Sequence, residues 1–245
     1  RIETDWIRAL NLYANLSAAR VKIGDYDLAD LRLTIDARDG VFTLAEYQVK
    51  IDGRPTTFRG LVDTRLEPPW YRFSGEIRGD TLEALLALED GIFVGGELNG
   101  NFKLQSQGST VGEFIENLDG EALLEMGPLG ITSNALTVFS SDILHSILSG
   151  VTAKKEGQPT SAYDCAVLGV DVNNGMARAR RTFTMQARDY NLAGTGELDL
   201  NTGYIDFAVR PRARRGLGLS ISTLVGGFRI KGHMATPELG LSGGS

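Results

Sequence analysis

Residues 71–78 read Tyr-Arg-Phe-Ser-Gly-Glu-Ile-Arg, a strict alternation between apolar or small side chains and wettable ones. A period of two places one set of side chains on each face of a β-strand. Parallel strands, which are covered on both faces, would read as continuous apolar runs instead. The same alternation recurs at residues 31–36, 98–105, 183–188, 205–210 and 228–234. The sequence therefore predicts a mainly β protein whose antiparallel sheet has one apolar face.

Glycine marks the turns between these strands. The chain has 30 glycines among 245 residues and only seven prolines, which favours many tight turns. Asn99-Gly100 lies inside an alternating run, where it marks either a turn or a bulge. Gly75, Gly100 and Gly232 fall on the apolar face and predict sheet curvature or space for an acyl chain. Dipeptides that favour the positive φ angles of hairpins occur at Asp39-Gly40, Asp52-Gly53, Asp90-Gly91, Asp119-Gly120 and Asn174-Gly175.

Three stretches have the spacing of short helices. Asp80 is expected to cap a helix with leucines at 82, 85, 86 and 88. Thr110 and Glu113 form a capping box before Phe114, and the longest candidate covers residues 133–149. These helices interrupt the sheet and do not alternate with strands, which argues against a βαβ fold.

The order of the predicted elements favours an antiparallel meander, curved into an open groove or incomplete barrel, with a few short inserted helices. We expect a single domain over residues 1–245, with a helix-containing insertion at residues 80–150. A weak repeat relates residues 39–73 to residues 174–207: each has a glycine turn, a strand, and a strand that ends in Asp. Chance similarity between strand-rich segments is the alternative explanation of this repeat.

Composition restricts the class of protein. Hydrophobic residues make up 42% and charged residues 23%, an ordinary balance for a soluble globular chain. No apolar run approaches the length of a membrane-spanning helix. The chain begins at Arg1 without a methionine or a signal peptide, so we expect it to be a piece of a longer protein. The net charge of −6 argues against binding to nucleic acid.

Residues that carry chemistry are few. The single cysteine, Cys165, lies in an apolar stretch and is expected to be a buried, inert thiol. The two histidines, His145 and His233, are expected on the polar side of a helix and on the wettable face of the last strand. The chain has no phosphate-binding loop, dinucleotide fingerprint or nucleophile elbow. We therefore expect no enzyme, no metal site and no cofactor.

Positive charge is concentrated in residues 176–231, which hold ten basic and four acidic residues, a local net of +6. The remaining 15 basic and 27 acidic residues give −12. Within this region, Arg210, Arg212, Arg214 and Arg215 are predicted to contact lipid head groups or a membrane surface. The alternative is a solvated loop, or charges that protect a sheet edge from aggregation.

The apolar face has two interpretations. It is either the inside of a closed sandwich or barrel, or an open, curved surface that holds acyl chains, whose burial is worth about 0.8 kcal/mol per methylene. In the second interpretation the residues predicted to line a lipid groove are Leu31, Leu33, Ile35, Phe73, Ile77, Leu98, Phe102, Leu104, Phe183, Met185, Ile205, Phe207, Val209, Phe228 and Ile230.

Three segments of the C-terminal part match motifs of one known family. Residues 194–200 fit a G-x-G-x-L-D-L segment, and residues 228–239 fit a closing I-x-G-T-x-x-x-P element, with His233 in place of threonine. These motifs resemble the C-terminal region of the AsmA family. Residues 118–130 are similar to its L-x-G-x-x-x-L-x-x-G segment, which a helix follows. The resemblance covers roughly 60% of the chain and is diffuse before residue 110.

The resemblance implies a periplasmic envelope protein of Gram-negative bacteria, anchored in the inner membrane by a helix upstream of this chain. It also implies a relation to TamB-like bridge proteins, whose β-sheet grooves are thought to carry phospholipid between membranes. Its partners would be phospholipid or another lipid, the inner membrane and envelope proteins, and the family has no catalytic residues to transfer. The alternative function is a scaffold that assists outer-membrane protein assembly, with a closed β core. A hydrolase of envelope components is a more distant third.

Overall fold

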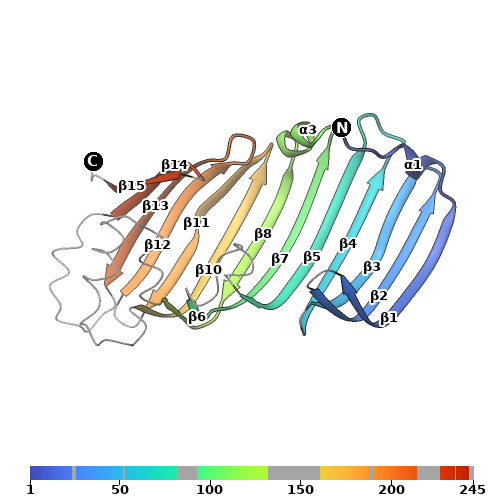
Figure 1. The fold of residues 1–245 in the computed structure, drawn as a ribbon. Helices are drawn as coiled ribbons and strands as arrows, with labels where there is room; N and C mark the ends of the chain where they lie inside the picture. Colours follow the sequence, from blue (N-terminus) through green and yellow to red (C-terminus); the bar gives the residue numbers. More distant parts are fainter. Residues whose placement is uncertain are drawn as a thin grey trace. The chain divides into compact units, whose positions relative to one another are not determined.

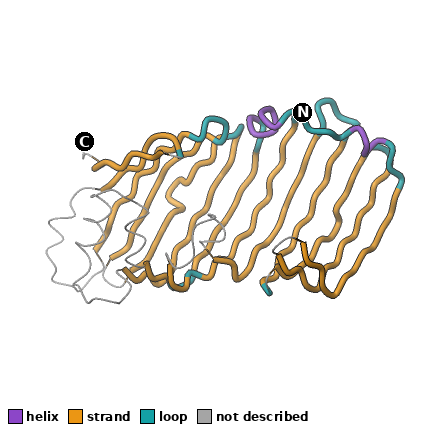
Figure 2. The backbone as a smooth tube through the Cα atoms, viewed as in Figure 1, coloured by secondary structure: helices purple, strands orange, loops and turns teal. Residues whose placement is uncertain are grey.

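A computed structural model describes residues 1–23, 26–51, 53–81, 93–131, 161–187, 190–213, 227–234 and 236–242. The described chain is dominated by strands (Figures 1 and 2). It divides into two compact units, described one at a time. Unit 1 consists of Arg1–Gly79, Asn99–Leu123 and Asp171–Ala177, and unit 2 of Asp80–Leu98, Leu124–Val170 and Arg178–Ser245.

Unit 1 contains two short helices and a run of long strands. In chain order they are α1 (Asp5–Arg8), β1 (Leu12–Ile23), β2 (Tyr26–Arg38), β3 (Val41–Ile51), β4 (Arg54–Asp63), β5 (Trp70–Thr81), β7 (Glu97–Gln107) and α3 (Val111–Glu116). The strand β8 (Asp119–Met126) has residues in both units, and the ends of β5 (80–81) and β7 (97–98) belong to unit 2.

Unit 2 contains the later strands and two three-residue ones. They are β6 (Phe93–Gly95), β9 (Leu129–Ile131), β10 (Ser161–Asn173), β11 (Met176–Ala187), β12 (Tyr190–Asp199), β13 (Tyr204–Ala213), β14 (Gly227–His233) and β15 (Thr236–Ser242). The ends of β10 and β11 nearest to Asn174 belong to unit 1.

Hydrogen-bonded neighbours follow chain order. The main path is β1-β2-β3-β4-β5-β7-β8-β10-β11-β12-β13-β14-β15, while β6 pairs with β9 and β9 also pairs with β10. The hairpins β1–β2, β2–β3, β3–β4, β4–β5, β12–β13, β13–β14 and β14–β15 are antiparallel. The path begins at β1 and ends at β15 without closing on itself. The predicted antiparallel meander is confirmed, and its strand order is open.

Strand register separates the two faces. In unit 1, Leu33 lies opposite both Leu16 and Tyr47, and Tyr47 lies opposite Phe58. Their neighbours point to the other face, where the Thr34 hydroxyl donates a hydrogen bond to the Asn15 side-chain oxygen at 2.9 Å. Because side chains alternate along a strand, the register puts the apolar set on one face throughout the hairpin series.

Two predicted hairpin turns are confirmed and one is wrong. Asp39 and Gly40 have φ angles of 50° and 77°, and Asn174 and Gly175 have 47° and 70°, the positive pair that a type I′ turn requires. Asp119-Gly120 does not form a turn, because both residues lie in β8. A Cβ at position 120 would lie only 2.9 Å from the Leu104 Cα and would also collide with the Lys103 carbonyl. Gly120 therefore allows β8 to approach β7 closely.

Other predicted turns fall inside strands or outside the described residues. Asn99-Gly100 lies within β7 and does not connect a hairpin. Gly53 has the positive φ of a turn, 83°, whereas its partner Asp52 lies outside the described residues. Asp90-Gly91 also lies outside them.

The helix predictions have mixed outcomes. Thr110 caps α3, with its hydroxyl accepting a hydrogen bond from the Glu113 N–H, and the Glu113 carboxylate accepts one from the Ser109 N–H at 2.7 Å. The capping box is thus confirmed, with one difference: the Glu113 carboxylate binds the N–H of Ser109, one residue before the cap residue Thr110. Asp80 lies in β5 and caps no described helix. The rest of that candidate, and the one at residues 133–149, lie outside the described residues.

Both described helices lie at the same end of the strands of unit 1 (Figure 1). The sequence analysis did not predict α1, which buries Ile7 and places the Trp6 ring 5.8 Å from that of Phe42. The Arg8 guanidinium donates to the Thr64 carbonyl oxygen at 2.7 Å. The Thr64 hydroxyl in turn donates to the Gly40 carbonyl at 2.7 Å, and Thr64 is fully buried. These bonds fasten α1 to the turns beside it.

One single-residue prediction is wrong. Cys165 is exposed on β10, although it lies in an apolar stretch of sequence. Its neighbour Ala166 is buried instead. His233 is exposed at the end of β14, as expected for the wettable face, although this strand is followed by β15 and is not the last one.

Candidate functional site

The apolar face of unit 1 carries a continuous row of aromatic rings. Phe58 lies 6.3 Å from Phe102 and 5.8 Å from Phe73, centroid to centroid. Phe73 lies 6.3 Å from Tyr71, and Tyr71 meets Phe114 of α3 edge-on at 5.2 Å. These five residues, here called the aromatic row, run across β4, β5 and β7 to the helix.

Glycines on this face lie beneath the rings. Gly75 lies opposite Phe58, and a Cβ built on it would be 2.9 Å from the Phe102 ring. Gly60 lies opposite Phe73, and its Cβ would be 3.2 Å from the Phe58 ring. The expectation that Gly75 leaves room for an acyl chain is therefore wrong, because an aromatic ring occupies that space. The result is a surface of ring atoms at these positions.

Unit 2 has a smaller version of the same arrangement. The rings of Phe183 and Phe207 meet edge-on at 5.4 Å, and a Cβ on Gly194 would be 2.7 Å from each of them. Phe207 lies directly between Gly196 on β12 and Ile230 on β14. An aromatic pair in unit 2 thus replaces the longer row of unit 1.

The predicted lining residues lie on the apolar face and most of them stay partly exposed. Leu98 and Val209 are buried, with 4% and 5% of their surface exposed. Met185 packs against the buried pair Leu129 and Tyr163 and so belongs to a local cluster of unit 2. The half-buried members are Leu31, Leu33, Ile35, Phe73, Ile77, Phe102, Leu104, Phe183, Met185, Ile205, Phe207, Phe228 and Ile230.

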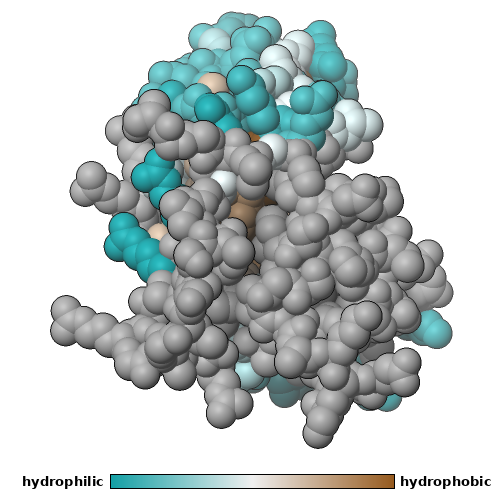
Figure 3. Space-filling model, turned by 90° about the vertical axis from the view of Figure 1, so that its left-hand side faces the viewer, coloured by the Kyte–Doolittle hydropathy of each residue, from teal (hydrophilic) through white to brown (hydrophobic). Residues whose placement is uncertain are grey.

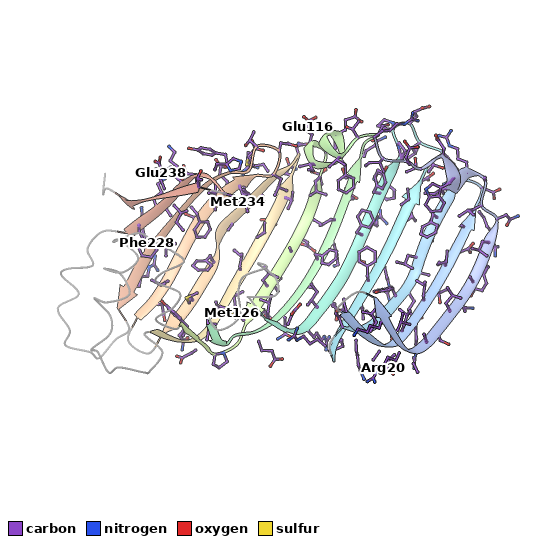
Figure 4. The ribbon with its side chains drawn as sticks, in the orientation of Figure 1. Arg20, Glu116, Met126, Phe228, Met234 and Glu238 are labelled. Carbon is purple, nitrogen blue, oxygen red and sulfur yellow. The ribbon has the colours of Figure 1, made fainter. Side chains whose placement is uncertain are left out.

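Figures 3 and 4 show the side chains of the described residues. In Figure 4 the sticks project from the strands, with Phe228 on β14 and Met126 at the end of β8. In the view of Figure 3 the described atoms on the outside are mostly hydrophilic, and some hydrophobic atoms are visible deeper between them.

The sequence analysis missed several residues of this face. Tyr47, Phe58 and Phe114 belong to it by register or ring contact but were not predicted. Leu12 and Leu16 of β1 also lie on it by register, and 42% and 55% of their surface is exposed. Phe58 stands on β4, where threonines at 56 and 57 hide the alternation. The sequence signal for a ring at this position was the pair of glycines near it: Gly75 lies opposite Phe58, and Gly60 follows it by two residues on β4.

Polar groups on the apolar face are engaged. The Tyr71 hydroxyl donates to the Gly108 carbonyl oxygen at 3.2 Å, and burial raises the pKa of Tyr71. A neutral phenol there suits an apolar surface. Among the described residues, no group of three or more His, Cys, Asp or Glu side chains could hold a metal ion. Nor does this part of the chain contain a helix that is both long and apolar enough to cross a bilayer.

Two carboxylates at strand ends accept hydrogen bonds from turn residues. The Asp63 side chain accepts bonds from the Arg65 guanidinium and the Arg65 N–H, which lower the pKa of Asp63. The Asp199 side chain accepts bonds from the Asn201 N–H at 2.9 Å and the Thr202 N–H at 3.2 Å, and hydrogen bonds from Thr202 and Asn201 lower the pKa of Asp199. Both carboxylates stabilise turns.

Hollows occur on the polar face of both units. One, of about 490 Å³ in unit 1, is lined by side chains of β3, β4, β5 and β7 that include Gln48, Arg59, Glu76 and Lys103. Another, of about 640 Å³ in unit 2, is bordered by Arg210 and Arg212. These two arginines lie in β13. One interpretation of the sequence had placed them in a solvated loop instead. Arg214 and Arg215 lie outside the described residues.

Comparison with known proteins gives one relative. The chain is similar to the AsmA family protein YhjG of Escherichia coli strain K12, with 22% identity over 149 residues. That region is 61% of this chain and 21% of YhjG, so the chain spans about a fifth of the length of that relative. No protein-family model matches the chain, and no solved structure matches it. The similarity supports an AsmA-like chain, while a relation to TamB-like proteins stays a prediction.

Proposed function

We propose that this chain is a lipid-binding β-sheet domain of the Gram-negative cell envelope that contributes to phospholipid movement between the inner and outer membranes. The observation that carries the proposal is the half-buried state of the apolar face. Phe73 and Phe102 in unit 1, and Phe207 in unit 2, keep part of their surface accessible. Accessible apolar surface is a feature of ligand-binding and lipid-binding sites, and this supports the proposal.

The ligand that fits such a face is an acyl chain. Burying each methylene contributes about 0.8 kcal/mol, so a long chain gains on the order of 10 kcal/mol from an apolar surface alone. Contacts between methylenes and aromatic rings have no direction, and a chain held by them is free to slide. The one polar group described on the aromatic row, the Tyr71 hydroxyl, already donates its hydrogen bond to the Gly108 carbonyl.

The similarity to an AsmA family protein supports the same proposal. We place the domain in the periplasm, with its full-length protein held at the inner membrane by a segment upstream of this chain. Binding and conduction of lipid, without catalysis, is the proposed activity. Envelope proteins are further proposed partners.

Photo-crosslinking tests the proposal without disturbing the sheet. A photoreactive phenylalanine analogue at Phe102 or Phe207 is expected to crosslink phospholipid that co-purifies with the protein. The same analogue at Asn101, whose exposed side chain lies on the other face of β7, or at Asn201 in the β12–β13 turn, is expected to give none. Mass spectrometry of the crosslinked peptide identifies the lipid.

Charge substitution gives the second test. Phe102→Glu and Phe207→Glu are expected to lower the bound lipid per protein several-fold while circular dichroism stays largely unchanged. Asn101→Glu and Asn201→Glu add the same charge and are expected to keep the lipid. Unfolding of both phenylalanine variants together with absence of lipid crosslinks would overturn the proposal, because a sealed core and a scaffolding role would then explain the apolar face.

A further inference from the structure

The polar face of unit 2 contains a hollow that the lipid-binding face does not use. Its volume is about 640 Å³, within the range of small-ligand sites. Small residues form its floor and basic or hydroxyl side chains form its walls. The lining residues are Thr184, Ala193, Gly194, Thr195, Ala208, Arg210 and Arg212.

Strand register explains the hollow. Arg210 and Arg212 are two residues apart on β13, so their side chains share one face, while Val209 between Ala208 and Arg210 belongs to the apolar face. Ala193 lies directly opposite Arg210, and Thr195 lies opposite Ala208. Since alanine is short, the space beside the Arg210 guanidinium is left open.

The charges around the hollow differ from those on the rest of this face. Towards the β12–β13 turn, Arg178 pairs with Glu197 at 3.4 Å. Arg229 forms a two-bonded ion pair with Asp206, which lowers the pKa of that carboxyl. The lining of the hollow within the described residues includes no acidic side chain, and both of its arginines are exposed. Among the described residues, Arg178 and Arg229 are therefore ion-paired, whereas the lining of the hollow offers Arg210 and Arg212 no carboxylate.

We propose that this hollow binds a phosphate group through Arg210 and Arg212. Guanidinium groups form paired, charge-assisted hydrogen bonds with phosphate oxygens. The hydroxyls of Thr184 and Thr195 add neutral donors at the same hollow. The phosphate belongs either to a lipid head group or to a soluble phosphate ester, which present the same oxygens to the arginines.

The experiment compares two double variants with equal change in charge. Arg210→Gln with Arg212→Gln removes the arginines of the hollow, whereas Arg178→Gln with Arg229→Gln removes two ion-paired arginines of the same face. Binding is measured at low salt to phosphatidylcholine vesicles with and without phosphatidylglycerol, and to soluble glycerol phosphate by calorimetry. Circular dichroism verifies that all variants keep the fold.

The hollow variant is expected to bind phosphatidylglycerol vesicles about 25-fold more weakly, roughly fivefold for each arginine near a charged surface, and the control less than about twofold more weakly. A loss for vesicles alone identifies a lipid head group, and a loss for glycerol phosphate alone identifies a soluble ester. Equal losses in both double variants, or no loss in either, would overturn the proposal. The result is independent of lipid crosslinking at Phe207, so the failure of one proposal does not imply failure of the other.

Discussion

The hairpins β4–β5 in unit 1 and β12–β13 in unit 2 are built on the same plan. In the first, Gly60 lies directly opposite Phe73. In the second, Gly196 lies directly opposite Phe207. The second part of the weak sequence repeat, residues 60–73 and 196–207, therefore corresponds to one structural element, a glycine on one strand under a phenylalanine of the next.

Both hairpins also end their first strand on an aspartate that stabilises the turn. Asp63 accepts the Arg65 N–H, and Asp199 accepts the Asn201 and Thr202 N–H groups. The loops between these aspartates and the next strands differ in length, six residues from 64 to 69 against four from 200 to 203. The comparison teaches that the glycine, the ring and the aspartate define the repeat, and that the loop does not.

The two glycines differ in the space around them, which gives the largest expected effect. A Cβ on Gly196 would lie 2.5 Å from the Asp206 carbonyl oxygen and 2.6 Å from the Phe207 Cα, both backbone atoms that cannot turn away. A Cβ on Gly60 would meet only ring atoms of Phe58 and Phe73, at 3.2 and 3.4 Å. Gly196→Ala is expected to destabilise by about 3 kcal/mol, and Gly60→Ala by less than about 0.5 kcal/mol.

Urea unfolding of the two glycine variants measures this difference. Equal losses of stability in Gly196→Ala and Gly60→Ala would contradict the closer approach of backbone atoms at Gly196.

The second prediction concerns the length of the ring rows. Phe58 contacts Phe73 and Phe102, whereas Phe183 has Phe207 as its ring partner. Phe58→Ala removes two aromatic contacts and is expected to cost about 2 kcal/mol, and Phe183→Ala about 1 kcal/mol. Thermal unfolding of both variants provides the measurement, and a larger loss for Phe183→Ala would show that the row in unit 1 adds no stability.

The third prediction tests the helix that ends the aromatic row. Thr110→Ala removes the cap of α3 and is expected to cost about 1 kcal/mol. Because Phe114 of this helix contacts Tyr71 and Phe73, hydrogen exchange is expected to accelerate at β5 in unit 1. Thr110→Ser keeps the hydroxyl and serves as the control. Unchanged hydrogen exchange at β5 would show that α3 does not stabilise the aromatic row.

The smallest effect is a dependence on pH. The pKa values of Asp63 and Asp199 lie below the ordinary 3.8, since hydrogen bonds favour their charged forms. The stability they contribute is therefore complete above about pH 4 and is lost as the pH falls through their lowered pKa values. The unfolding midpoint is expected to fall more steeply in acid for the wild type than for Asp63→Asn or Asp199→Asn. Glu116→Gln, at an exposed carboxylate of α3, is the control.

Alternation predicted strands, with their faces, within β2, β5, β7, β11, β13 and β14, but it did not reveal β4, where two threonines hide it. Each predicted half-buried residue, such as Phe73 or Ile230, lies where its position in the alternating run placed it. The turn dipeptides Asp39-Gly40 and Asn174-Gly175 were equally informative, because both of their residues adopt positive φ angles.

Features that depend on pairing could not be predicted. Asp119-Gly120 has the composition of a turn, but Gly120 approaches the neighbouring strand at Leu104 within β8. The exposure of Cys165 depends on which side of β10 faces a neighbour. The contacts of Gly75 with Phe102 join residues 27 positions apart, and register shifts such as the one between Leu44 and Tyr47 alter such pairings without a mark in the sequence.

The pairing of a ring with a glycine has a consequence for folding fidelity. If a strand slipped by one residue, its phenylalanines would move to the polar face. If it slipped by two, each ring would meet a side chain in place of the bare backbone of Gly60, Gly75 or Gly196. A long meander offers many alternative alignments of similar backbone hydrogen bonding. The ring and glycine pairs penalise both the odd and the even slips, so each strand that adds to the growing sheet is selected for one alignment.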